Sequence, residues 1–286
     1  MLGFLDVFTD IAMNTQGVTV QTMIGRSIMH RLHAFWSIGF TTGALAGWGA
    51  SAVKLPMGTH LSLVAAALIT TILVCRRKLT APDPRPDGTA PGSDSTSRAK
   101  FVVSTTVVAT AVMAVGFAFL EASPNDWSAL TLRDVFSAGK WQGIGSVVFA
   151  GAMLAGRLGG DHVLERVGGR RLIDFALALA SIGAAVVVFA PVTAVAVIGF
   201  GLWGLGVSVM FPQLYALAAA LPGTSSGAGL GAMAIGQRSG FMLAPVIIGT
   251  VADRQNLRWS LALITVVATI FVLSSRRLVS PARSEA

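Results

Sequence analysis

The sequence has few charged residues, since only 12% of its 286 residues are Asp, Glu, Lys or Arg. A soluble domain carries roughly 25%, so this composition argues against a soluble protein. Its single cysteine, Cys75, excludes an internal disulfide and offers no metal-ligand spacing. No glycine-rich stretch is followed by a Walker lysine, and no serine or cysteine nucleophile lies in a recognisable motif. We therefore expect no enzyme, cofactor, metal or nucleotide site.

Hydrophobic residues make up 53% of the chain, and the mean hydropathy is +0.72. Apolar runs of about 18 residues or more indicate transmembrane helices, and such runs recur along most of the sequence. The chain is predicted to be an all-α integral membrane protein with about nine transmembrane helices. The expected segments are 1–24, 33–53, 57–75, 101–122, 139–160, 172–190, 192–220, 227–251 and 258–275.

A polar stretch divides three expected helices from six. Residues 76–100 are rich in proline, serine, threonine and aspartate, and such a segment cannot bury enough apolar surface to fold. We expect an N-terminal part at 1–75, a flexible cytoplasmic linker at 76–100, a six-helix part at 101–275 and a cytoplasmic tail at 276–286.

The positive charges are distributed unevenly between the two sides of the expected helices. If residues 156–171 face the cytoplasm and the spans alternate, 15 of the 21 lysines and arginines lie inside, five lie outside and Arg238 falls within a helix. Cytoplasmic loops carry an excess of Lys and Arg. This bias accounts for the net charge of +8 as a topology signal, so nucleic acid is not expected as a partner.

The densest cluster of glycine and charge lies at 156–171, with the sequence Gly-Arg-Leu-Gly-Gly-Asp-His-Val-Leu-Glu-Arg-Val-Gly-Gly-Arg-Arg. This pattern resembles the loop signature of the major facilitator superfamily, in which a glycine and three residues precede an aspartate, and a glycine and basic residues follow. Counted from Gly156, the step to Asp161 is one residue longer than usual. The resemblance implies a cytoplasmic loop between the second and third helices of a six-helix half.

Other stretches resemble a bacterial subgroup of this superfamily. Residues 10–17 with Gly25, Arg26 and His33 resemble its fourth helix and following loop, while 121–129 and 240–249 resemble its seventh and eleventh helices. The resemblance implies a complete six-helix C-terminal half, a partial N-terminal half, and the absence of the first three helices. Residues 1–24 are then either the fourth helix of a twelve-helix transporter or a segment that does not span the membrane.

Ionisable and polar residues inside a bilayer are costly and mark candidate functional sites. Arg238 either binds an anionic substrate group, pairs with a carboxylate such as Asp10, or is purely structural. Asp10 and Asn14 either line a polar cavity or carry a proton, or they form hydrogen bonds between helices. Glu121 is a candidate proton site, although its expected place near the outer end of a helix also fits an exposed rim carboxylate.

The cluster at 156–171 provides a second set of candidates. The family resemblance implies a latch that holds two helices in one access state, whereas charge neutralisation at the lipid surface is the alternative. The expected latch residues are Gly156, Arg157, Gly160, Asp161, Arg166, Gly168 and Arg170.

Small residues recur every four positions in two of the expected helices. One row contains Gly39, Gly43 and Gly47, and another contains Gly236, Gly240 and Ala244. Such rows permit close contact between helices in lipid, so both are expected to face a neighbouring helix. The contact is either static packing or a face that slides or rocks during transport.

These features predict a secondary transporter of the facilitator type in a bacterial inner membrane, with a cytoplasmic C-terminus. Its expected partners are the lipid bilayer, a small solute and protons. The alternative is a non-transporting membrane protein, which is either a truncated remnant of such a transporter or a protein with an assembly or regulatory role.

Overall fold

The computed structural model describes residues 29–76, 104–219, 221 and 226–279, together with Thr9, Met13, Gly17, Val20, Met23 and Ile24. The chain is helical in these ranges, and no strand occurs among the described residues. The elements are α2 (Met29–Ala52), α3 (Met57–Cys75), α4 (Thr105–Asp134), the short 3₁₀ turn η2 (Gly139–Trp141), α5 (Ile144–Val167), α6 (Gly169–Phe189), α7 (Thr193–Val207), α8 (Met210–Ala219), α9 (Ser226–Ala252) and α10 (Leu257–Val279). The predicted all-α architecture is confirmed.

Seven helical segments of the described chain are long and apolar enough to cross a membrane. They are α3, α4, η2 with α5, α6, α7 with α8, α9 and α10. Helix α2 is 24 residues long but is not among them; its first turns carry His30, Arg31 and His33. The expected first segment, 1–24, lies mostly outside the described residues.

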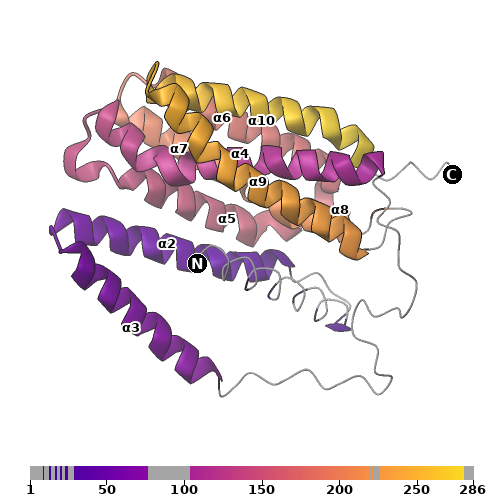
Figure 1. The fold of residues 1–286 in the computed structure, drawn as a ribbon, viewed down its shortest axis with the longest axis horizontal. Helices are drawn as coiled ribbons and strands as arrows, with labels where there is room; N and C mark the ends of the chain where they lie inside the picture. Colours follow the sequence, from indigo (N-terminus) through magenta and orange to yellow (C-terminus); the bar gives the residue numbers. More distant parts are fainter. Residues whose placement is uncertain are drawn as a thin grey trace.

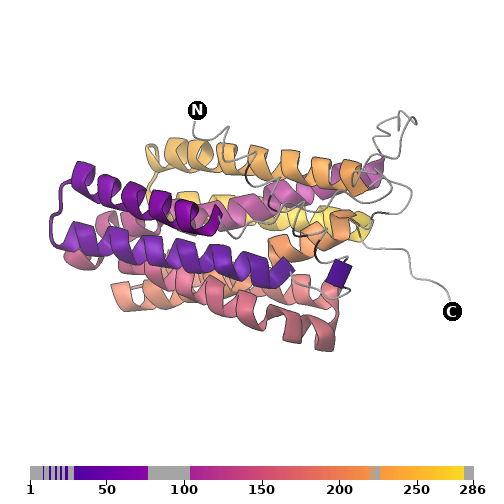
Figure 2. The same ribbon diagram turned by 90° about the horizontal axis from the view of Figure 1, so that it is seen from below.

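The long helices run side by side as a bundle (Figures 1 and 2). Helix α4 packs against α9 and α10, α6 packs against α7, and α5 packs against both α7 and α2. The core side chains include Phe117, Phe149, Phe200 and Trp203, each with 0% exposure. Helix α3 diverges from the other helices in Figure 1, and none of its described residues is buried.

Glycines allow the closest helix contacts. A Cβ on Gly236 would lie 2.1 Å from the Ala111 carbonyl oxygen of α4, and one on Gly240 would lie 2.5 Å from the Ala118 Cβ. The predicted contact face on α9 is therefore confirmed. The row on α2 is different, because a Cβ at Gly39, Gly43 or Gly47 would meet no atom within 4 Å in the described structure.

Helix α4 continues through Pro124 to Asp134, so the expected end at residue 122 is wrong. Proline removes one helical hydrogen bond, but transmembrane helices tolerate it when other groups satisfy the backbone. The carbonyl that loses its donor is that of Leu120, four residues before the proline, while the Ser123 hydroxyl donates to the adjacent Phe119 carbonyl at 2.6 Å. The extension places Glu121 near the middle of α4 instead of near its end.

The expected single helix at 192–220 consists of α7 and α8, with a turn at Ser208 and Val209 between them. Ser208 directs its hydroxyl back to the Leu205 carbonyl at 2.6 Å. Its own carbonyl accepts a hydrogen bond from Arg157 Nε at 3.2 Å. The turn therefore provides a backbone acceptor inside the bundle.

The expected cytoplasmic loop at 156–171 is mostly helical. Helix α5 extends to Val167 and α6 begins at Gly169, with Gly168 as the only residue between them. Gly168 has φ 79°, a left-handed conformation that glycine adopts readily. The prediction of a long loop is therefore wrong, since the chain reverses at one glycine.

Candidate functional site

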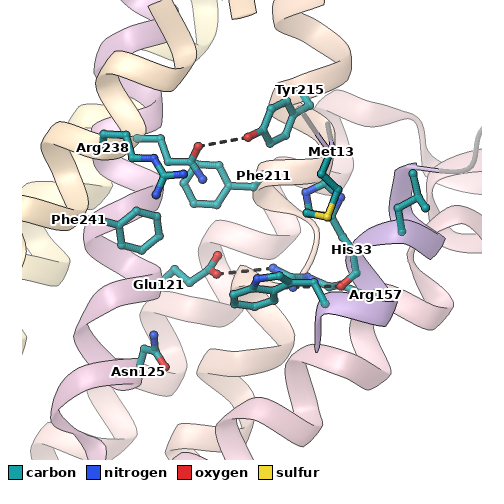
Figure 3. A pocket seen from close by; sticks show the side chains of 12 residues that line it. Met13, His33, Glu121, Asn125, Arg157, Phe211, Tyr215, Arg238 and Phe241 are labelled. Atoms are coloured by element: carbon teal, nitrogen blue, oxygen red, sulfur yellow. Dashed lines mark hydrogen bonds and ion pairs between the residues drawn. The ribbon is translucent and has the colours of Figure 1, made fainter. Parts of the chain in front are cut away.

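A cavity of about 250 Å³ lies between α2, α4, α5, α8 and α9 (Figure 3). Two of its lining residues are Glu121, near the middle of α4, and Arg238, near the middle of α9. The cavity therefore brings together residues that are far apart in the sequence. Its described lining consists of Met13, Leu32, His33, Trp36, Glu121, Asn125, Arg157, Phe211, Tyr215, Gln237, Arg238 and Phe241.

Arg157 of α5 is the most deeply buried charged residue of this lining, with 2% exposure. Its Nη1 donates to the Ser37 hydroxyl at 2.6 Å and to the His33 carbonyl at 3.4 Å, both on α2. Its Nε donates to the Ser208 carbonyl between α7 and α8. The guanidinium carbon also lies 5.1 Å from the centre of the Trp36 ring. One arginine thus joins three parts of the bundle.

Glu121 of α4 is the counter-charge to Arg157. Its Oε1 lies 3.6 Å from Arg157 Nη2, which is longer than a normal hydrogen bond. The glutamate is only 5% exposed, and its Oε2 is buried with no hydrogen-bond partner in the described structure. The expectation of an exposed rim carboxylate is therefore wrong, because α4 continues past Pro124 and encloses this residue in the bundle.

Aromatic and amide side chains form the rest of the wall. Tyr215 donates from its hydroxyl to Gln237 Oε1 at 3.2 Å, and its ring lies 5.6 Å from that of His33. The rings of Phe211 and Phe241 stack with their centres 6.0 Å apart. The wall therefore offers both flat apolar surface and polar groups, which is typical of small-molecule sites.

Arg238 lies on α9 and lines the same cavity as Glu121 (Figure 3). Two of the four residues predicted for the substrate or ion pathway are therefore in one cavity. The other two, Asp10 and Asn14, lie outside the described residues. Arg238 is not the only cation within a helix, because Arg157 was assigned to a loop and is in fact inside α5.

The predicted latch residues do not form one cluster at a loop. Arg157 and Gly160 are buried in α5, and a Cβ on Gly156 would lie 2.2 Å from the Ser208 hydroxyl. Arg166 and Arg170 are exposed near the turn at Gly168. Asp161 borders a second hollow, of about 470 Å³ between α2 and α5, together with Arg31, His162 and Glu165. Arg157 reaches both spaces.

Sequence reasoning missed several contributors to the cavity. Trp36, Ser37, Tyr215 and Gln237 belong to no motif, and the Ser208 carbonyl acts through its backbone. The one available signal for Gln237 was its position as a polar residue within an apolar run. The turn at Ser208 left no comparable trace, since the sequence on both sides of it is apolar.

No protein-family model matches the chain. Among curated proteins, an uncharacterized MFS-type transporter of Yersinia pestis is 28% identical over 273 residues, which are 93% of this chain and 68% of that protein. The resemblance to the major facilitator superfamily is confirmed. The uncharacterized transporter y4wD of Sinorhizobium fredii is 26% identical over 87% of this chain. Membrane protein MosC of Rhizobium meliloti is 35% identical over 52% of this chain.

The matched segments cover 65% of y4wD and 37% of MosC, so the chain spans less than two thirds of the length of these relatives. Seven helical segments of the described chain are apolar and long enough to span a membrane, and the relatives are named as transporters or membrane proteins. The chain is therefore a multi-pass membrane protein that resembles facilitator-type transporters.

Proposed function

We propose that the protein is a secondary transporter that moves a small solute through the cavity at Glu121 and Arg157 by alternating access. The observation that carries this proposal is the buried Glu121–Arg157 pair in the cavity wall. Charged groups within a membrane are costly and are typical of substrate and ion pathways. A structural ion pair alone would not require the adjoining cavity.

The contacts of α2 provide the moving parts for this function. Near one end of α2, Trp48 donates from its indole to the Lys140 carbonyl at 3.0 Å. Further along, Ser37 and the His33 carbonyl accept hydrogen bonds from Arg157. Rocking of α2 against α5 breaks these contacts in turn and opens the cavity to one side and then to the other.

Protons are the proposed driving ion, and Glu121 is the proposed proton site. A proton on Glu121 removes the negative charge that faces Arg157 Nη2. The remaining hydrogen bonds of Arg157 run to α2 and to the turn at Ser208. Protonation of Glu121 therefore changes the strength of the contacts between Arg157 and α2, which must break when α2 moves. This links a titratable group to a movable interface.

Arg238, with Asp10 and Asn14, is proposed to complete the pathway. Arg238 shares the cavity with Glu121, and an arginine presents several donors in a fixed planar arrangement. Asp161, Arg166 and Arg170 are proposed to act as a conformational latch at the α5–α6 turn. We also propose an inner-membrane location, with this turn, the 76–100 linker and the C-terminus in the cytoplasm.

The same proposal divides the chain into an N-terminal part, 1–75, and a six-helix unit, 101–275. The described helices of the second part share the buried core around Phe117 and Trp203, whereas α3 has no buried residue. Limited proteolysis in detergent is expected to cut the linker and leave the C-terminal fragment longest-lived. Longer survival of the N-terminal fragment would contradict this division.

Reconstitution into liposomes tests the transport function. With a pH-sensitive dye inside, addition of a mixture of small metabolites is expected to cause solute-dependent proton flux in the wild-type chain. Glu121→Gln should abolish this flux, whereas Asp134→Asn, at the exposed end of the same helix, should retain it. Equal flux from both variants would exclude Glu121 as the proton site.

The bare surface of α3 favours a second candidate function in assembly or regulation. Its described residues include exposed Leu61, Leu68, Ile69 and Ile72, and the row at Gly39, Gly43 and Gly47 also has no neighbour in the described structure. Small and apolar faces of this kind associate with other helices in membranes. A tight oligomer without any solute flux would support this second function over transport.

A further inference from the structure

The cavity wall holds a carboxylate, that of Glu121, with one oxygen that has no hydrogen-bond partner in the described structure. Glu121 is 5% exposed, and its Oε2 has no partner there. A buried acceptor without a partner is costly, and more so when it is charged. This oxygen therefore marks a position where a bound molecule that donates a hydrogen bond would be favoured.

Arg157 cannot satisfy Glu121 fully because its other bonds hold it in place. Nε and Nη1 are committed to Ser208, Ser37 and His33. Nη2 has only the 3.6 Å contact with Glu121 Oε1 among the described groups. Arg157 Nη2, a donor, and Glu121 Oε2, an acceptor, thus belong to two residues that line the same cavity.

The mixed charge of the wall discriminates between classes of solute. An ammonium group would be attracted by Glu121 but would face Arg157 and Arg238 in the same cavity. A carboxylate would be attracted by the arginines but would face Glu121. A hydroxyl is neutral, donates one hydrogen bond and accepts two, so it matches both kinds of group without a repelled charge.

The remaining wall suits a small, ring-shaped or compact polyol. Trp36 and Phe241 contribute apolar ring surface to the wall, while Asn125 and Gln237 carry amides that both donate and accept. The cavity volume, about 250 Å³, is below the roughly 300–1,000 Å³ of sites for drug-sized ligands. The space therefore fits a solute of few atoms.

We propose that the cavity binds a neutral, polyhydroxylated solute the size of a monosaccharide, one hydroxyl of which donates to Glu121 Oε2 and accepts from Arg157 Nη2. This inference rests on the proposed function, because it names the class of solute for the same cavity. It assigns recognition to Glu121 in addition to the proposed role of that residue in proton coupling.

Calorimetric titration of the purified full chain in nanodiscs tests the inference. The probes are glucose, cyclohexylamine and cyclohexanecarboxylate, which share a six-membered ring and differ in their polar groups. Glucose is expected to bind the wild type at least tenfold more tightly than either charged probe. Glu121→Gln should weaken glucose binding by roughly tenfold or more, as expected for loss of a hydrogen bond to a charged group, while Asp134→Asn should not change it.

The wild-type comparison needs no variant, so a folding defect in Glu121→Gln does not obscure the result. Tighter binding of either charged probe, or no binding of glucose, would overturn the inference and leave transport of another solute class open. Glucose binding that depends on Glu121, without any transport in liposomes, would instead support the inference and contradict the proposed function.

Discussion

Replacement of Arg157 by methionine provides a strong test of the buried pair. Arg157→Met keeps an unbranched side chain of similar length but removes the hydrogen bonds to Ser37 and the Ser208 carbonyl, at 2.6 and 3.2 Å. It also leaves Glu121 without its counter-charge at 3.6 Å. Removal of one partner from a buried ion pair costs about 3–5 kcal/mol, a large part of the roughly 5–15 kcal/mol that stabilises a typical domain.

Glu121 can reduce this cost by taking up a proton, because an unpaired buried carboxylate is more stable when neutral. The loss should therefore lie toward the lower end of that range. In the double variant Arg157→Met/Glu121→Gln, the uncompensated charge is absent. We expect it to recover part of the lost stability, within the roughly 0.5–3 kcal/mol coupling measured between residues in contact.

The assay is a titration with sodium dodecyl sulfate in mixed micelles, followed by far-ultraviolet circular dichroism. The matched control is Arg133→Met, because Arg133 pairs with Asp134 at the exposed end of α4, where both side chains are at least half exposed. Exposed pairs contribute little, so this variant should unfold like the wild type. If Arg157→Met also unfolds like the wild type, or if the effects of the two cavity substitutions are simply additive, the pair does not stabilise the bundle.

Three further predictions concern packing, orientation and the pathway. In the same titration, Gly206→Ala should destabilise the bundle by about 1–3 kcal/mol or more, because the added Cβ would lie 2.4 Å from the Ala180 backbone nitrogen. Gly151→Ala should be tolerated, because no described atom lies within 4 Å of its added Cβ. In intact cells, a cysteine at Ser93 should resist an impermeant thiol reagent and one at Gln255 should react; ready labelling at Ser93 would reverse the orientation. In expression-matched transport assays, Arg238→Ala should abolish activity and Arg238→Lys should retain part of it, since lysine keeps the charge but lacks the planar fork; wild-type transport by Arg238→Ala would make this residue incidental to the pathway.

The membrane character of the chain could be predicted from the sequence, because long apolar runs dominate its composition. Helix ends were harder to predict. An end at residue 122 was expected, but α4 continues through Pro124 to Asp134. The cluster at 156–171 indicated a loop, yet α5 continues to Val167 and α6 begins at Gly169.

The candidate site was predicted only in part for a related reason. Glu121 and Arg238 were found because ionisable residues stand out within apolar runs. Arg157 was found but misplaced, since its partners Glu121, Ser37 and the Ser208 carbonyl lie on other helices. Contacts between distant segments leave no local pattern, and a backbone acceptor created by the α7–α8 turn has no signature in side-chain chemistry.

The central claim is that a wet cavity beside Glu121 and Arg157 provides the path for solute. The most direct measurement is the rate at which a small, charged methanethiosulfonate modifies a single cysteine, in a Cys75→Ala background because Cys75 is exposed. Asn125→Cys lies in the cavity wall and should react quickly, since water there allows the thiol to ionise. Phe175→Cys, on the outward face of α6 with 63% exposure, should meet lipid and react slowly. Equal resistance at both positions would show that the cavity is dry and would contradict the account.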